Sequence, residues 1–498
     1  MSPRWRDCRP EKATTPRESI GPFALNMEVR FMGARNVLVF MTDGHRKEML
    51  GCYGNRLLET PNIDACAGEG VRFERAFGVH SVCMPTRASV YTGRYPHIHG
   101  VWANGCRLRE SEITLPRVLS EAGWATGAAG KIHFEPQQPY DRFAPQIEGS
   151  YYGFDEAHLS ENRMGREYLD WVESEHPQLT ERVLARTNVP QEAHELQWIT
   201  SQAIDFIQRQ AASDTPFFCH CSFHELSPPC TPPEGWAGLH DPAEVPLPEL
   251  RADDLALRPA WYRECYEGYL ANGRQPDEPT LRRSIASCYD QMRFIDHQFG
   301  RITGALDELG IADDTLVVFM ADHGLSLNDH FQWRHGPFLF DEVTNIPMIW
   351  RLPGGASGAV THEMIEQVDV MPTILDALGV EPPAGVQGRS MLPLLRGDED
   401  ARGRESVLMQ EREAPDLAAR GLAPERISEW AVRTQEWKLV HYPGEEFGEL
   451  YDLRSDPGEF VNLWGDPGYG AQRTELERLL LDRIAEARDP LPVREWGW

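Results

Sequence analysis

The sequence lacks long hydrophobic runs. Residues 1–31 carry several basic side chains and no apolar stretch, so this segment does not resemble a signal peptide. No window elsewhere reaches the length of a membrane-spanning helix. We therefore expect a cytoplasmic protein that does not contact a membrane, with a disordered tail over residues 1–31 and a fold that begins at Met32.

Paired cysteines are also lacking. The ten cysteines are irregularly spaced and do not form the C-x-x-C units of a structural zinc site. Cys219 and Cys221 are close to each other, but they belong to an apolar run, residues 217–223, that is typical of a core strand. The pattern favours a reducing compartment and gives no support for a zinc site.

Positive charge is scarce. The chain has 49 Lys and Arg residues against 77 Asp and Glu residues, which gives a formal net charge of −28. Such a chain repels nucleic acid and anionic membranes unless a local patch reverses the field. The same charge argues against a long polysulfated polysaccharide as substrate, whereas a small anionic ester needs only a local basic pocket.

Two apolar runs end in acidic turns. Residues 36–41 precede Asp43, and residues 315–320 precede Asp322 and His323. Both runs are continuous enough to be strands of a parallel sheet buried on both faces, and open α/β sheets place their sites at the carboxyl ends of such strands. Carboxylates there suit a divalent cation such as Ca²⁺, Mg²⁺ or Mn²⁺, although each aspartate taken alone could be a helix cap or a turn residue.

A third segment lies between these turns in the sequence. Residues 81–94 contain the pattern C-x-P-x-R, formed by Cys83, Pro85 and Arg87, and then T-G-R. Pro85 fits an early helical position, so Cys83 lies at a helix N-terminus, where unpaired N–H groups favour an anion. Arg87 follows one turn later and can point to the same anion. The alternative for Cys83 is an ordinary buried cysteine.

The motif of residues 83–94, with an acidic turn on either side of it, resembles the modification motif of the sulfatases, a family of the alkaline phosphatase superfamily. It is similar to bacterial arylsulfatases, choline sulfatases and phosphonate monoester hydrolases. Further segments extend the resemblance over most of the chain, namely residues 51–55, 60–64, 70–73, 130–134 and 449–463.

The resemblance and the composition together predict the architecture. We expect an α/β fold in which helices flank a large, mixed and mostly parallel sheet, with a catalytic domain over residues 32–395, because 498 residues exceed a single core. A smaller C-terminal α+β subdomain follows over residues 396–498. Its expected elements are an antiparallel pair at residues 430–433 and 437–442 and a helix at residues 474–487, and the catalytic domain should include a long helix at residues 281–309.

The resemblance also implies the chemistry of the site. A formylglycine-generating or equivalent maturation enzyme would oxidise Cys83 to formylglycine, whose hydrate attacks sulfur and later expels sulfate. Arg87 and Lys131 would stabilise the charge of the transferred group, and His133 would contact a hydroxyl of the hydrate and take its proton. Gly44 departs from the family, which has Asp or Gln there, so either one metal ligand or one group that supports the ligands is absent. The implied ligands of the metal, which we expect to be Ca²⁺ with Mn²⁺ or Mg²⁺ as alternatives, are Asp43, Cys83, Asp322 and His323.

Two further departures concern the leaving group. Ser227 stands where the family places a histidine, and His335 replaces a lysine before Gly-Pro-Phe. If the pKa of His335 stays near the reference value of about 6.5, it can serve as the general acid at cellular pH. His224, three residues before Ser227, is the competing acid. Each histidine could instead be an ordinary hydrogen-bonded residue.

These features predict a sulfatase that hydrolyses a small sulfate ester to an alcohol and inorganic sulfate. The first alternative is a phosphonate monoester or phosphodiester hydrolase of the same superfamily, which uses the same aldehyde and metal. The second is a non-catalytic homologue that binds anions, motivated by Gly44 and Ser227. Assembly as a homo-oligomer stays open.

Overall fold

The computed structural model describes residues 33–136, 150–161, 165–226, 228–271, 273, 276–412 and 428–492. The chain separates into two units, Met1–Phe31 and Met32–Trp498. The tail that we predict at residues 1–31 lies outside the described residues, and the domain boundary at residue 395 stays a prediction.

A large central sheet runs through the unit Met32–Trp498. In the described part of the chain it has nine strands, in the order β10-β2-β9-β6-β1-β5-β3-β4, with β11 paired to β2. Strand β1 is parallel to β5 and β6, whereas β9 is antiparallel to β2 and β6. The predicted mixed, mostly parallel sheet is therefore confirmed. Its strands are β1 (Asn36–Thr42), β2 (Val71–Phe77), β3 (Ala125–Gly130), β4 (Glu156–Leu159), β5 (Phe217–Ser222), β6 (Thr315–Ala321), β9 (Asn345–Arg351), β10 (Ala359–Thr361) and β11 (Ile365–Glu366).

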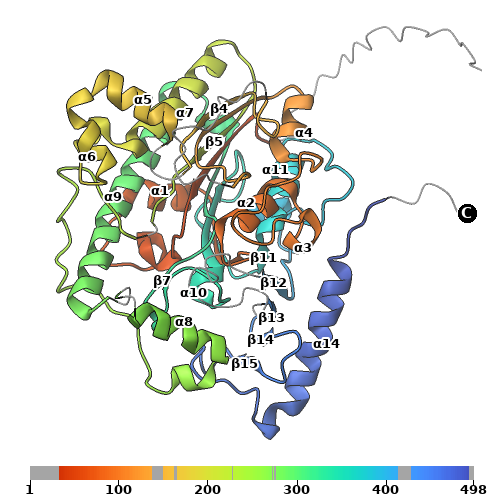
Figure 1. Ribbon diagram of the computed structural model, residues 1–498. Helices are drawn as coiled ribbons and strands as arrows, with labels where there is room; N and C mark the ends of the chain where they lie inside the picture. The colour runs from red at the N-terminus through yellow and green to blue at the C-terminus, as the bar shows by residue number, and fades with distance from the viewer. Residues whose placement is uncertain are drawn as a thin grey trace, which may run out of the picture. The chain divides into compact units, whose positions relative to one another are not determined.

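Helices cover both faces of this sheet (Figure 1). Successive side chains of a strand point to opposite faces, so Leu38 and Phe40 of β1 enter one hydrophobic core while Val37 and Val39 enter another. The first core includes residues of α1 (Pro61–Glu69), α7 (Glu195–Ala212) and α9 (Glu278–Glu308). The second includes residues of α2 (Cys83–Thr92), α4 (Leu115–Glu121) and α11 (Val370–Ala377).

The long helix α9 begins three residues before the predicted start. Asp277 caps it by accepting a hydrogen bond from the Thr280 backbone N–H, and a proline lies in its first turn. Asp296, near its middle, accepts hydrogen bonds from the backbone N–H groups of Asn62 and Ile63 and so caps α1. No helix in the described residues is long and apolar enough to cross a membrane.

Further helices and a small second sheet precede the C-terminal part of the chain. The helices are α3 (Pro96–His99), α5 (Arg166–Glu175), α6 (Thr180–Leu184), α8 (Ala260–Ala271), α10 (Asp341–Thr344) and α12 (Leu392–Arg396), and a two-stranded sheet pairs β7 (Ser326–Leu327) with β8 (Trp333–Arg334).

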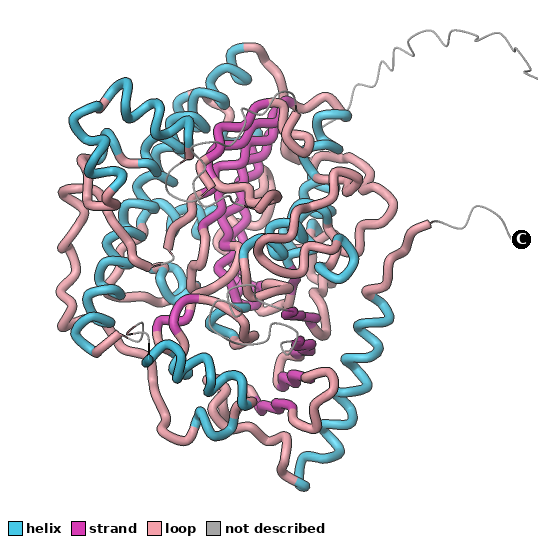
Figure 2. Tube along the Cα trace, viewed as in Figure 1, coloured by secondary structure: helices cyan, strands magenta, loops and turns pink. Residues whose placement is uncertain are grey.

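A second, antiparallel sheet follows in the C-terminal part of the chain (Figure 2). We predicted two of its strands, but β12 and β15 flank them, so the sheet has four strands in sequence order. Strand β12 pairs with β13 across residues 413–427, a separation that leaves no hairpin signal in the sequence. The elements are β12 (Val407–Arg412), β13 (Ser428–Arg433), β14 (Trp437–His441), β15 (Gly448–Asp452) and the closing helix α14 (Gly470–Glu486).

A buried carboxylate, Glu366 at the end of β11, joins α14 to the central sheet. It accepts a hydrogen bond from the Tyr95 hydroxyl and pairs with Arg404 at 3.0 Å and with Arg483 of α14 at 2.9 Å. Its side chain is fully buried. Two guanidinium groups from distant segments thus share this carboxylate, and Arg404 also pairs with Asp369.

Candidate active site

The carboxyl ends of β1 and β6 lie side by side. Thr42 pairs with Ala321, so Asp43 and Asp322 follow at the same edge of the sheet. Backbone bonds tie the two turns together, because the Asp322 N–H donates to the Thr42 carbonyl at 3.0 Å and the Gly44 N–H donates to Asp322 Oδ1 at 3.1 Å. The structure therefore brings both aspartates to one point.

Cys83 begins helix α2 beside these turns. Residue 82 is extended, the Met84 N–H donates to Asn104 Oδ1 at 3.0 Å and Pro85 has no N–H, so an anion at this helix start would be favoured by the Cys83 N–H and the helix dipole. The thiol is 4 % exposed, and its Sγ lies 3.4 Å from His323 Nε2. One ligand atom from each of Asp43, Cys83, Asp322 and His323 lies within 4.8 Å of the others.

Two basic side chains, Arg87 and Lys131, form ion pairs with the carboxylates of Asp322 and Asp43. Arg87, which is fully buried, donates through Nε to Asp322 Oδ2 at 2.7 Å, and Lys131 Nζ donates to Asp43 Oδ2. Arg87 Nη1 is satisfied by the Lys131 carbonyl and by Ser222 Oγ. Arg87 Nη2 makes no hydrogen bond and lies 3.7 Å from Asp43 Oδ2, which leaves it able to bind an oxyanion.

The charges of the cluster shift its titration. Burial opposes the charged form of Asp43, but Lys131, His323 and Arg87 hold its pKa well below the usual range. Burial likewise opposes the charge on His323, but Asp322 and the Cys83 sulfur raise its pKa to about 10. The negative groups around His323 thus stabilise a positive charge there, whether it is carried by a proton or by a bound cation.

The donor set fits a divalent cation. Two carboxylates offer hard oxygen ligands, His323 offers an imidazole nitrogen, and residue 83 lies within reach of all three. Gly44 offers no side chain. Its φ is +60°, and a Cβ there would lie 3.4 Å from His323 Cε1, so a bulkier residue would crowd the imidazole.

The other predicted histidines of the site lie near this cluster. The backbone N–H of His133 donates to the Glu161 carboxylate, and burial followed by the charges of Lys131 and Arg87 lowers the pKa of its ring well below the usual value. The ring of His335 is 4.6 Å from that of His323, and its ligand nitrogen is within 4.8 Å of Cys83 Sγ.

The surroundings of His335 do not favour the ordinary pKa on which its role as general acid was conditional. Burial, and next the positive charge of His323, lower its pKa well below 6.5. A bound cation would repel a proton on His335 in the same way. His335 is therefore a neutral imidazole at cellular pH, which is not the protonation state of a general acid.

His224 lies among a different set of side chains. Its Nε2 is 3.5 Å from Glu195 Oε2 and 3.4 Å from Glu225 Oε1, in a hollow that also includes Tyr168 and not Cys83. The backbone of this segment nevertheless supports the site, because the Asp43 N–H donates to the Glu225 carbonyl at 2.8 Å. Ser227 lies outside the described residues.

Sequence reasoning missed two groups, one beside Cys83 and one beside Ser81, two residues earlier. Asn104 accepts a hydrogen bond from the Met84 N–H at 3.0 Å, and its amide lies 3.9 Å from Cys83 Sγ. Glu411 of β12 accepts a hydrogen bond from Ser81 Oγ and lies 3.2 Å from His80 Nδ1. Glu411 is 330 positions from Ser81 in the chain, so no local pattern could connect them.

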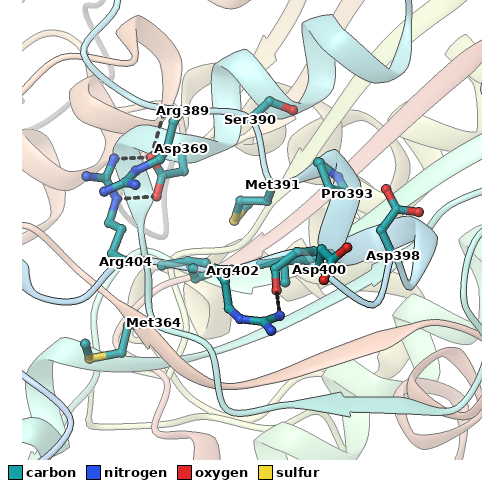
Figure 3. Close-up of a pocket in the computed structure, with 14 residues that line it drawn as sticks. Met364, Asp369, Arg389, Ser390, Met391, Pro393, Asp398, Asp400, Arg402 and Arg404 are labelled. Atoms are coloured by element: carbon teal, nitrogen blue, oxygen red, sulfur yellow. Dashed lines mark hydrogen bonds and ion pairs between the residues drawn. The ribbon is translucent and has the colours of Figure 1, made fainter.

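A larger hollow, of about 390 Å³, lies elsewhere, between β11 and α12 (Figure 3). Arg404 and Asp369 face each other there, and their ion pair satisfies both groups. None of its lining residues belongs to the cluster around Cys83. The candidate site is therefore the cluster around Cys83 and not this hollow.

Comparison with known proteins defines the class. The sulfatase family model matches residues 35–380, and a model of the C-terminal region of N-sulphoglucosamine sulphohydrolase matches residues 329–486. The chain belongs to the sulfatase family, within the alkaline phosphatase superfamily, and is a sulfuric ester hydrolase.

Three relatives illustrate the likeness. The N-acetylglucosamine-6-O-sulfatase of Bacteroides thetaiotaomicron is 27% identical over 92% of this chain and 87% of its own length. The arylsulfatase of Clostridium perfringens is 26% identical, with coverages of 90% and 94%. Among solved structures, the phosphonate monoester hydrolase of Agrobacterium radiobacter has a TM-score of 0.79 at 26% identity, with coverages of 92% and 97%.

Proposed function

We propose that this sulfatase hydrolyses a small sulfate ester by means of a formylglycine made from Cys83 and a divalent cation bound next to it. One observation carries the proposal. Cys83 begins a buried helix within reach of Asp43, Asp322 and His323, and two cationic side chains hold the carboxylates.

The formylglycine would supply an oxygen nucleophile that no encoded side chain offers. Helix α2 suits this role because the positive end of its dipole and Arg87 both favour a transferred anion next to residue 83. Since Cys83 is only 4 % exposed, we expect a formylglycine-generating or equivalent maturation enzyme to modify it before the fold closes.

The cation would stabilise negative charge on the transferred group and orient residue 83. Asp43, Asp322 and His323 would hold it together with that residue. Our expectation of Ca²⁺ agrees with the two carboxylates, whereas the imidazole nitrogen is a better ligand for Mn²⁺. Metal analysis of the purified protein distinguishes the two.

The remaining side chains act on charge and hydrogen bonding. Arg87 and Lys131 would bind the oxygens of the transferred group, where charge builds up in the transition state. His133, neutral because of its lowered pKa, is able to accept a proton from a hydroxyl at residue 83. His335, also neutral, would donate a hydrogen bond to an ester oxygen.

The size of the substrate and the location of the protein are part of the proposal. The net charge of −28 disfavours a long polyanion and leaves a small ester as the substrate class. The irregular cysteine spacing favours the cytoplasm. Fractionation of cells that produce the protein tests the location.

The likeness to a phosphonate monoester hydrolase supports a second candidate, hydrolysis of phosphonate monoesters or phosphodiesters. Turnover of an aryl sulfate and of the matching aryl phosphonate by the same mature preparation separates the two. A higher kcat/KM for the sulfate supports our proposal, and a higher value for the phosphonate favours the alternative. The second alternative, a non-catalytic anion-binding homologue, predicts no turnover of any ester in a wider screen of small sulfate esters.

A further inference from the structure

Two cysteine thiols lie in contact next to residues 225–226, the segment whose backbone bonds to Asp43. The Sγ atoms of Cys230 and Cys288 are 3.0 Å apart, although the residues are 58 positions apart in the chain. Cys230 is 8 % exposed and Cys288 is fully buried. Cys288 lies near the middle of α9, and Cys230 lies in the segment that follows β5.

Both sulfurs face the same backbone carbonyl. The Leu226 oxygen is 3.4 Å from Cys230 Sγ and 3.9 Å from Cys288 Sγ. The N–H of the same residue donates to the Asp43 carbonyl, and the neighbouring Glu225 carbonyl accepts from the Asp43 N–H. Leu226 therefore contacts both thiols through its carbonyl and Asp43, a predicted metal ligand, through its N–H.

We propose that Cys230 and Cys288 are a modification site, a pair that forms a reversible disulfide and fastens this segment to α9. The two sulfurs need to move only slightly closer to form a disulfide bond. The bond would link residues 230 and 288 within the first hydrophobic core. Neither residue belongs to the cluster around Cys83, so the proposal does not depend on the formylglycine.

The oxidant would be a low-molecular-weight disulfide. The more exposed thiol, Cys230, attacks one sulfur of the oxidant as its thiolate, which forms a mixed disulfide and releases one thiol. Cys288 then attacks Cys230 Sγ and releases the second thiol. Two cysteine thiols and one disulfide thus give one protein disulfide and two small thiols, and the two protons pass to the released thiolates. In a reducing compartment the pair stays a dithiol.

The test uses the full chain and bis(2-hydroxyethyl) disulfide, a small uncharged disulfide. After exposure, remaining thiols are alkylated and the peptides are mapped by mass. We expect a peptide pair joined through Cys230 and Cys288, its loss after dithiothreitol, and a rise in Tm of about 4 °C, because a long loop is closed in the unfolded chain.

Three variants sharpen the result. Cys230→Ser and Cys288→Ser should each abolish the cross-link, whereas Cys66→Ser, which alters another buried cysteine, should keep it. Alkylation of Cys230 and Cys288 as separate thiols in the treated wild-type protein, or a cross-link to another cysteine, would overturn the proposal. A cross-link that leaves the Tm unchanged would overturn the claim that it fastens the segment to α9.

Discussion

At the scale of single residues, the site depends on protonation states that burial imposes. Two histidines near Cys83, His133 and His335, have lowered pKa values, whereas His323, which faces the carboxylates, has a raised one. Neutral imidazoles of His133 and His335 are therefore favoured, and they can accept or donate hydrogen bonds. At His323, by contrast, the neighbouring carboxylates favour a positive charge.

His335→Ala tests the neutral role of that histidine. Loss of one hydrogen bond to an ester oxygen should lower kcat/KM by about tenfold. Because a neutral imidazole does not protonate the leaving group, the loss should be equal for aryl sulfates with good and with poor leaving groups. Steady-state kinetics with the two esters measures this, and a much larger loss for the poor leaving group would restore His335 as the general acid.

Glu411→Gln tests the buried carboxyl beside Ser81. Burial raises the pKa of Glu411 from 4.5 to about 8, so the folded protein retains a proton there that the unfolded chain loses. Its contribution to stability is complete below pH 4.5 and is lost as the pH rises through about 8. We expect the free energy of unfolding to fall between pH 5.5 and 8.5 in the wild type and to fall less in the variant.

Denaturant titrations at the two pH values provide the measurement. Asp296, whose pKa burial raises to about 6, Glu342, whose pKa burial raises to about 7, and buried histidines such as His45 titrate in both proteins, so the test is the difference between the two slopes. An identical fall in wild type and variant would show that Glu411 is already ionised in the folded protein.

At the scale of elements, much was predictable because the signals were local. The apolar runs of β1 and β6, the proline near the start of α2 and the stripe of α9 each lie within one segment, and the structure confirms all four elements. Strand β12 and the contact between Glu411 and Ser81 depend on pairing across long separations, whereas β15 pairs with its neighbour β14 across residues 442–447, a short turn with Pro443-Gly444 that sequence reasoning overlooked. The pKa of His335 depends on burial, which the sequence alone does not reveal.

Glu366→Gln tests how α14 is attached. The substitution removes the carboxylate charge that faces Arg483, whereas Arg404 keeps its pair with Asp369, so unfolding should require about 1.5–3 kcal/mol less free energy. Glu477→Gln is the matched control on α14, because Glu477 makes a half-exposed pair with Arg473 at 3.7 Å and should cost less than about 1 kcal/mol. Equal effects in denaturant titrations would contradict the account.

At the scale of the whole molecule, the acidic surface should repel anionic substrates. The net charge of −28 predicts that kcat/KM for a sulfate ester bearing further negative charges rises as salt screens the repulsion. A sulfate monoester with an uncharged alcohol portion should respond much less. Kinetics at low and at physiological ionic strength compares the two esters, and a fall with salt for the polyanionic ester would indicate a local basic patch.

The central claim is that Cys83 becomes the catalytic aldehyde. The most direct measurement is the mass of the peptide that contains residue 83, taken from a preparation that turns over an aryl sulfate and compared with inactive Cys83→Ala protein. We predict that the active preparation carries the lighter aldehyde at residue 83 and that turnover scales with the modified fraction. Full activity in a preparation whose Cys83 is entirely a thiol, or in Cys83→Ala, would contradict the account.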